Sequence, residues 1–385
     1  MKTWKRPLAL LLSLALTASL CACGSDDGDV TGTVDPDAGS SIAVDLSQDA
    51  VSFSAGLSSG DVLLTVNGED VPADLFLHFL YMNCDYTMYQ YYSRYGTVPD
   101  SLEPLSKSLM DSAVKTVLYR VILRKKAIES GCVLTDEQLA EVETDKTGEN
   151  QGTYEQYKAA YGLTDGSMEF LSASSYYYEN LLDAMVPTAT DEMLNNYVYQ
   201  VKHILLRTVD TDAEPVLQDD GTYAYPALPA ETVAAQRALA EDILAQLQAV
   251  EGEEQLTLFD ELMNQYSEDS GLTYYPDGYE YTVEDSLVDG FTEAALALEA
   301  GQISGIVETD YGYHIMLRGE VTDLKSYADD CRVYQLDKEL YALTDTAEVT
   351  RAPALDALDV DTFYHRYFAY FNAVMEQYEA EGAVG

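Results

Sequence analysis

The stretch GQISGIVETDYGYHI, residues 301–315, carries the pattern that decides the expected fold. Residues 303–309 and 313–318 hold β-branched and aromatic side chains, and the segment DYG between them is a turn signal. We therefore expect two antiparallel strands joined by a tight turn. Thr309 ends the first of these strands, and His314 lies on the second.

Strand and helix patterns upstream of this hairpin belong to the same expected domain. The apolar run around residues 199–207 is typical of a buried strand, and a polar loop with Gly and Pro follows it. Helical periodicity and glycine stops then predict helices at 231–250, 255–266 and 291–298. This order of elements predicts an α+β domain, with a small antiparallel sheet and surrounding helices, over residues 199–321.

Four sequence blocks in this region resemble the parvulin family of peptidyl-prolyl isomerases. They are KHILL at 202–206, YSEDS at 266–270, FTEAALAL at 291–298 and the 301–315 stretch. The blocks come in the family's order. The resemblance therefore implies a parvulin fold and cis/trans isomerisation of X-Pro peptide bonds.

The resemblance also implies a role for six side chains. The polar, catalytic ones are His203, Asp269, Thr309 and His314. The apolar ones, which line the proline pocket, are Leu287 and Phe291. The two histidines also fit a purely structural, hydrogen-bonded core pair, and that interpretation stays open.

The expected reaction requires neither a nucleophile nor a metal. Rotation about an X-Pro bond faces a barrier of about 20 kcal/mol from amide resonance, and it breaks no bond to carbon. A catalyst needs an apolar slot for the proline ring and polar groups that favour the twisted amide over the planar one. We expect no metal and no cofactor, and the sequence lacks both an H-E-x-x-H motif and a phosphate-binding glycine loop.

The region departs from the parvulin pattern in two places. Residues 274–279 read YYPDGY where family members carry a GGDLGW or GGDLGF stretch, and Val288 stands where a polar pocket residue is frequent. These departures affect the expected pocket rim and rate rather than the fold. No basic cluster follows the first strand beyond Arg207, so the sequence does not support specificity for phosphorylated substrates.

The N-terminus carries an export signal. Basic residues precede an apolar run that is too short to span a membrane comfortably, and LCAC at 20–23 resembles the lipobox of bacterial lipoproteins. The resemblance implies a signal peptide over 1–22 and a lipid on Cys23 that anchors the chain to the extracytoplasmic face of the cell membrane. An ordinary signal peptide cut near Ala22 is the alternative. Residues 23–60 are rich in small and polar side chains and predict a flexible tether.

Residues 61–198 and 322–385 predict helices on either side of the α+β domain. The opening VNGE at 66–69, followed by Pro72 and Phe76, resembles the N-terminal helical domain of SurA-like and PrsA-like chaperones. That resemblance implies one all-helical chaperone domain built from both segments, with the isomerase domain inserted in it. The chain has 31 Tyr against 9 Phe, which suits either peptide-binding surfaces or half-buried helix packing, and both interpretations stay open.

Acidic residues dominate the chain, which has 67 Asp and Glu against 21 Lys and Arg and a formal net charge of −46. Such a surface repels phosphate backbones, so we expect no nucleic-acid partner. Beyond the export segment, Cys84, Cys132 and Cys331 lie far apart and form no C-x-x-C motif, which excludes a zinc ribbon. Three buried thiols are expected, with one disulfide as the alternative.

These resemblances together imply an extracytoplasmic folding factor that isomerises X-Pro bonds in unfolded or newly exported polypeptides. The alternative, from the binding class, is a lipid-anchored chaperone whose parvulin domain is weak or inactive. A lipid-anchored solute-binding protein is disfavoured, because the sequence has no repeating α/β pattern.

Overall fold

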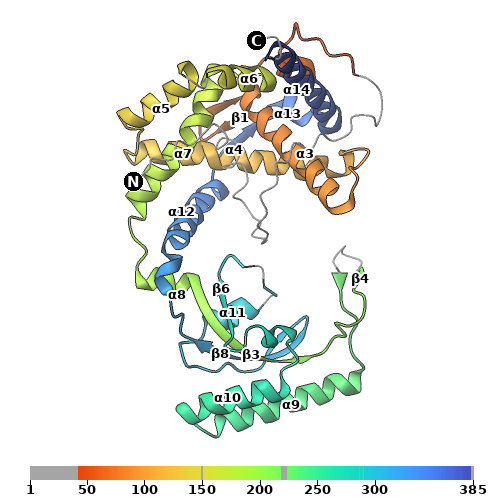
Figure 1. The fold of residues 1–385 in the computed structure, drawn as a ribbon, viewed down its shortest axis with the longest axis vertical. Helices are drawn as coiled ribbons and strands as arrows, with labels where there is room; N and C mark the ends of the chain where they lie inside the picture. Colours follow the sequence, from red (N-terminus) through yellow and green to blue (C-terminus); the bar gives the residue numbers. More distant parts are fainter. Residues whose placement is uncertain (1–41, 149–150, 218–222, 286, 289, 383–385) are drawn as a thin grey trace. The chain divides into compact units, whose positions relative to one another are not determined.

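The computed structural model describes residues 42–148, 151–217, 223–285, 287–288 and 290–382. The chain divides into two compact units (Figure 1). The helical unit comprises the described residues up to Pro187 together with those from Tyr334 onward, and the sheet unit comprises Thr188–Val333. The sheet unit is longer at both ends than the expected 199–321 domain, because the short helix α8 (Asp191–Tyr197) packs against the first strand of its sheet.

The sheet unit is built on a four-stranded antiparallel sheet with the order β6-β3-β8-β7. Its strands are β3 (Val198–Arg207), β6 (Tyr279–Thr282), β7 (Val307–Thr309) and β8 (Gly312–Gly319), and a separate ladder pairs β4 (Val216–Leu217) with β5 (Tyr223–Ala224). Its helices after α8 are α9 (Ala230–Gln248), α10 (Glu253–Tyr266), η2 (Ser270–Thr273), α11 (Phe291–Leu296) and η3 (Leu324–Tyr327). The predicted α+β class with a small antiparallel sheet is therefore confirmed.

The two faces of this sheet carry different helices, α9 and α10 on one and α11 on the other (Figure 1). Ile204 and Ile315 belong to the core that packs against α9 and α10, whereas Val201 packs with α11. Because successive side chains of a strand point to opposite faces, His203 and His314 lie on the α11 face. The strand alternation thus places both predicted catalytic histidines on the same side of the sheet.

The helical unit is not helical throughout, because it also holds a three-stranded sheet with the order β2-β1-β9. The strands are β1 (Val62–Val66), β2 (Glu69–Pro72) and β9 (Val349–Arg351). The helices are α2 (Ala50–Ala55), α3 (Ala73–Tyr95), η1 (Glu103–Leu105), α4 (Ser106–Glu129), α5 (Asp136–Thr147), α6 (Gln151–Tyr161), α7 (Asp165–Met185), α13 (Pro353–Asp356) and α14 (Val360–Gly382), while α12 (Ala328–Asp345) begins in the sheet unit and ends here. The prediction of an all-helical domain is therefore wrong. It did not include β9, because a strand this short leaves little periodicity in the sequence.

Helix α2 contradicts part of the predicted tether at 23–60. Phe53 is buried, and its ring lies 5.8 Å from that of Tyr370 on α14. The side chain of Asp49 caps the helix by accepting a hydrogen bond from the Ser52 amide. The tether prediction is therefore wrong for this helix, because the polar composition of the region concealed a short capped helix with one apolar face.

The C-terminal segment packs into the core of the helical unit. Tyr367 of α14 is fully buried and stacks on Tyr81 of α3, with ring centroids 4.5 Å apart. Its hydroxyl donates a 2.7 Å hydrogen bond to the backbone oxygen of Tyr161. Strand β9 also pairs with β1. The segments that precede and follow the sheet unit in the sequence therefore contribute to one core.

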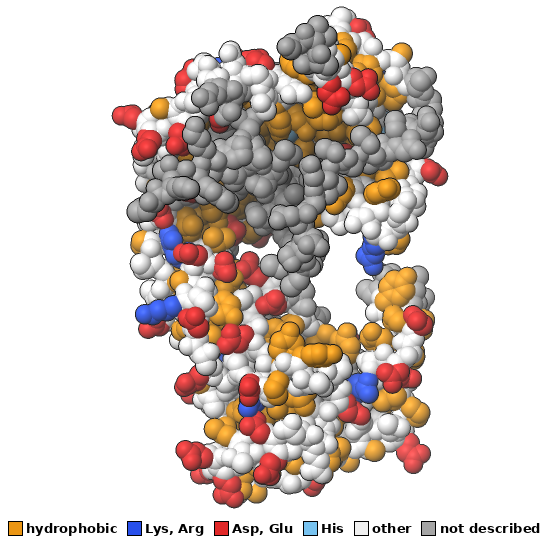
Figure 2. Space-filling view, viewed as in Figure 1, with side chains coloured by type: hydrophobic (Ala, Val, Ile, Leu, Met, Phe, Trp, Pro, Cys, Tyr) orange, Lys and Arg blue, Asp and Glu red, His pale blue; other side chains and the backbone are white. Residues whose placement is uncertain are grey.

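Cys84, Cys132 and Cys331 are each buried as thiols, and no disulfide joins them. Across the described ranges, no helix combines the length and the apolar character needed to cross a bilayer. The export segment and Cys23 lie outside those ranges. Figure 2 shows acidic side chains scattered over the visible face with few basic ones among them, as the composition leads one to expect.

Candidate active site

Strands β3 and β8 bring His203 and His314 together in the centre of the sheet. The register opposes His203 with Met316 and Leu205 with His314, so the two histidines are diagonal neighbours. Their Nδ1 atoms lie 3.0 Å apart, and the rings are nearly parallel with centroids 5.3 Å apart. Both side chains are buried, with exposed fractions of 9% for His203 and 3% for His314.

The other two predicted polar residues lie at the two ends of this pair. Asp269, in the segment that follows α10, places Oδ2 at 3.1 Å from Nε2 of His203. Thr309, at the end of β7, places Oγ1 at 2.8 Å from Nε2 of His314. The structure thus joins all four predicted catalytic side chains into one chain of hydrogen bonds.

The surroundings of these hydrogen-bonded side chains favour an ionised Asp269 and a neutral His314. Burial raises the pKa of the Asp269 carboxyl, but hydrogen bonds from His203, Tyr279 and a backbone amide outweigh it and lower that pKa to about 2. Burial, together with the neighbouring His203 ring, lowers the pKa of His314 to about 3. Near neutral pH, Asp269 is therefore a carboxylate and His314 is uncharged.

These charge states give the hydrogen-bond chain one direction when both rings are neutral. A carboxylate only accepts, so Nε2 of His203 carries a proton and donates to Asp269. Nδ1 of His203 then accepts from Nδ1–H of His314. Nε2 of His314 accepts in turn from the hydroxyl of Thr309. The network therefore assigns one tautomer to each histidine, and every donor in it has an acceptor.

An apolar cluster adjoins the two imidazole rings. Phe291, the first residue of α11, is 4% exposed, and its ring lies edge-on to His203 at 5.3 Å and to His314 at 5.4 Å. Leu287 is half-buried and packs in the same cluster, as does the fully buried Met316. The two predicted pocket residues therefore lie together, beside the polar network.

Tyr279 is a site residue that the sequence analysis did not identify. Its hydroxyl donates a 2.6 Å hydrogen bond to Oδ2 of Asp269, and its ring stacks on that of Tyr281. It belongs to β6, in the region treated only as a departure from the family pattern. The alternation of Tyr279 and Tyr281 with Glu280 and Thr282 is the signal that could have revealed this strand.

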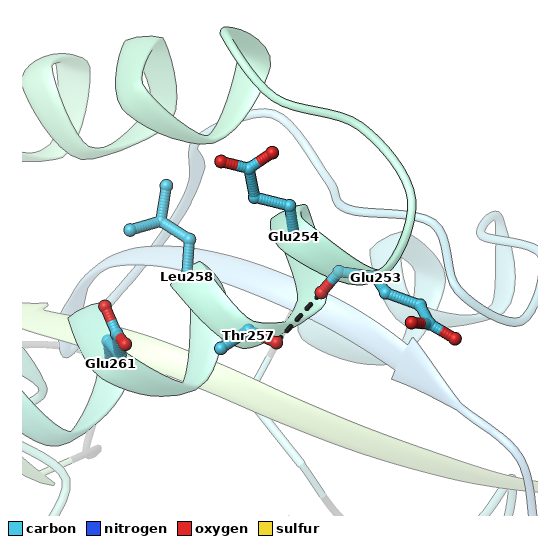
Figure 3. Close-up of a pocket in the computed structure, with 5 residues that line it drawn as sticks. All are labelled: Glu253, Glu254, Thr257, Leu258 and Glu261. Carbon is cyan, nitrogen blue, oxygen red and sulfur yellow. Dashed lines mark hydrogen bonds between the residues drawn. The ribbon is translucent and has the colours of Figure 1, made fainter.

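A surface hollow elsewhere on the sheet unit does not contribute to this site. It lies on α10 and is lined by Glu253, Glu254, Thr257, Leu258 and Glu261 (Figure 3). None of the predicted site residues lines it, and three of its five lining residues are acidic. In the portion of the chain that the structure describes, no three His, Cys, Asp or Glu side chains are grouped as metal ligands.

Residues 203–320 match the family model described as the PPIC-type PPIASE domain, or rotamase. The chain therefore carries a parvulin-type peptidyl-prolyl cis/trans isomerase domain. The matched range covers His203, His314 and the two predicted pocket residues, together with all of strands β6, β7 and β8 and the second half of β3.

Similarity to individual relatives extends beyond this domain. The chain is 29% identical over 261 residues to foldase protein PrsA 3 of Bacillus cereus, a match that covers 66% of this chain and 77% of that protein. It is 33% identical over 137 residues to the putative peptidyl-prolyl isomerase Cbf2 of Campylobacter jejuni, covering 34% of this chain and 49% of that one. A crystal structure of PrsA from Bacillus cereus aligns with 83% of this chain and 93% of its own, at 18% identity and a TM-score of 0.32. The sequence matches support a protein-folding peptidyl-prolyl isomerase.

Proposed function

We propose that the chain is a lipid-anchored, extracytoplasmic folding factor that isomerises X-Pro bonds in newly exported polypeptides. The observation that carries the catalytic part is the hydrogen-bonded series Asp269, His203, His314 and Thr309 beside the ring of Phe291. A polar network next to an apolar slot is what rotation about a prolyl bond requires.

The proposed mechanism follows from these contacts. Phe291 and Leu287 hold the proline ring, which fixes the amide beside the histidine pair. The slot removes water from the amide and so weakens the solvation that favours its planar, charge-separated form. The Asp269 carboxylate faces the substrate amide, and the two histidines keep that carboxylate and the Thr309 hydroxyl in fixed positions. The rate gain comes from interactions that favour the twisted amide over both planar isomers.

The proposed clients and location rest on the export segment and on the relatives. The matched Bacillus cereus protein is named a foldase, and the N-terminal LCAC of this chain resembles a lipobox. We infer that the chain acts outside the cytoplasm on polypeptides that have just crossed the membrane.

Isomerisation of a proline-containing tetrapeptide by the full chain is the direct test, and Asp269→Ala is the informative variant. We expect Asp269→Ala to lower kcat/KM about thirtyfold, because it removes the charge that orders the histidine pair. Asp269→Asn is the control for shape, since it keeps the size of the side chain and loses only the charge. Wild-type rates in Asp269→Ala would exclude a catalytic role for this carboxylate.

A second function, peptide binding without efficient isomerisation, is favoured by exposed tyrosines on α3. Tyr89, Tyr92 and Tyr95 have exposed fractions of 49%, 52% and 61%, and such side chains suit the binding of varied peptides. The same tetrapeptide assay separates the two functions. A folded chain that binds unfolded polypeptides but shows no rate enhancement would support the chaperone function alone.

The proposed lipid anchor on Cys23 is tested separately from the isomerase activity. We expect Cys23→Ala to abolish acylation and to move the protein from the membrane fraction to the soluble fraction, because two or more acyl chains on that cysteine supply the membrane affinity. Labelling with a radioactive fatty acid and cell fractionation check this result, with Cys21→Ala as the matched control. Continued acylation of Cys23→Ala would show that another residue carries the lipid.

A further inference from the structure

Tyr279 makes a hydrogen bond to Asp269 that a side chain without a hydroxyl, such as Phe, could not make at this position. Its hydroxyl donates to the same Asp269 oxygen, Oδ2, that accepts from His203. The second carboxylate oxygen, Oδ1, accepts from the backbone N–H of Gly271 at 3.0 Å. These three hydrogen bonds fix both oxygens of the carboxylate, so its orientation toward His203 is determined by its partners.

Gly271 provides a second observation that concerns the same hydroxyl. A Cβ atom placed on Gly271 would lie 1.9 Å from the Tyr279 hydroxyl oxygen and 3.0 Å from the ring carbon that bears it. The lack of a side chain at Gly271 is therefore what allows this hydroxyl to reach Asp269. Burial and the hydrogen bond to Asp269 raise the pKa of Tyr279, so the phenol keeps its proton and acts as the donor near neutral pH.

We propose that Tyr279 is a positioning residue of the isomerase site, whose hydroxyl holds Asp269 as an oriented carboxylate against His203. It thereby fixes the direction of the hydrogen-bond chain that runs through His314 to Thr309. This inference deepens the proposed catalytic function and rests on it. Tyr279 itself acts through Asp269 and is not assigned contact with the substrate.

The titratable groups that face Asp269 are His203 on β3, His314 on β8, and Tyr279 and Tyr281 on β6. Of these, His203 and Tyr279 donate hydrogen bonds to the carboxylate and thus favour its charged form. Removing the Tyr279 hydroxyl takes away one of these donors. The pKa of Asp269 must then rise from about 2 toward its ordinary value, and the carboxylate is lost at a higher pH than in the wild type.

The test is Tyr279→Phe in the full chain, with two readouts. We expect the ¹³C resonance of the Asp269 carboxyl, assigned with Asp269→Asn, to titrate at a pH higher by one unit or so, since a charge-assisted hydrogen bond is lost. We also expect kcat/KM at pH 7 to fall about tenfold, with the acid limb of its pH profile displaced upward. Gly271→Ala is the second variant: it retains the hydroxyl but displaces it, so its Asp269 titration should move in the same direction.

Tyr275→Phe is the matched control, because the Tyr275 ring also contacts that of Tyr279, with centroids 4.9 Å apart, and its side chain is 55% exposed. It should leave the Asp269 titration and kcat/KM unchanged. If Asp269 titrates in Tyr279→Phe as it does in the wild type, the positioning role is wrong, whatever the rate. A wild-type chain without isomerase activity would instead overturn the proposed function, while the carboxyl titration would still decide the role of Tyr279.

Discussion

Phe291→Ala is expected to lower kcat/KM for X-Pro isomerisation about a hundredfold, more than any other single change in the pocket. The ring of Phe291 contacts both His203 and His314 and is nearly fully buried, so its loss removes the apolar floor against which the proline ring is held. A hundredfold loss corresponds to about 2.8 kcal/mol of transition-state stabilisation, since each 1.4 kcal/mol is about tenfold in rate. A tetrapeptide isomerisation assay measures this loss, and denaturation curves of the same variant serve as the control for folding.

The control for Phe291→Ala must separate catalysis from folding, because Phe291 also belongs to the core of the α11 face. Phe291→Leu keeps an apolar side chain and should retain the fold with an intermediate rate. Leu296→Ala, on the same helix with a side chain 37% exposed, should leave both fold and rate unchanged. Phe291→Ala that is folded and fully active would contradict the assignment of the proline pocket.

The sequence predicted the sheet unit better than the helical unit, for a physical reason. Helices α9 and α10 and the strand β3 are long enough to show their hydrophobic period, and each was expected close to its observed position. Strand β9 has three residues, and α2 has six, which is too short for either period to be visible. Both are stabilised by tertiary contacts, since β9 pairs with β1 and α2 packs on α14.

The candidate site divides in the same way. His203, Asp269, Phe291, Thr309 and His314 occur in blocks that resemble a family, so their proximity could be expected before the structure was known. The contact of Tyr279 with Asp269 depends on the path of the 274–279 segment, which departs from the family pattern. Sequence spacing alone does not fix the path of such a segment, so the hydrogen bond from this hydroxyl to the carboxylate could not be predicted from it.

Ending the chain after Val333 is expected to unfold the helical unit while the sheet unit remains folded. This truncation removes β9 and α14 and, with them, a group of buried side chains from the helical core. They are Leu336, Leu340, Leu355, Val360, Phe363, Tyr364, Tyr367, Tyr370 and Val374. Full burial of one large apolar side chain contributes about 1.5–3 kcal/mol, whereas a whole domain is stable by only about 5–15 kcal/mol. The loss of the group therefore exceeds what the remaining helices can offset.

Hydrogen exchange followed by mass spectrometry distinguishes the two units within one sample. In the truncated chain, amides of α3 and α4 should lose their protection, while those of β3 and β8 should keep it. A milder version of the same test is Tyr367→Ala, which should lower the free energy of unfolding of the helical unit by about 3–5 kcal/mol. Tyr95→Ala is its control, since that tyrosine is 61% exposed at the end of α3.

Retained protection of α3 and α4 in the truncated chain would mean that the N-terminal segment folds without its C-terminal partner. The contacts argue against that outcome, because Tyr81 on α3 is buried chiefly by rings from α14, with Tyr367 at 4.5 Å and Tyr364 at 5.8 Å. Without them Tyr81 and its neighbours face water, and most of the stability of a helix in a protein comes from the packing of its apolar face. The residues that complete the core of the helical unit follow the sheet unit in the chain, so we expect this core to form only after the sheet unit has been synthesised.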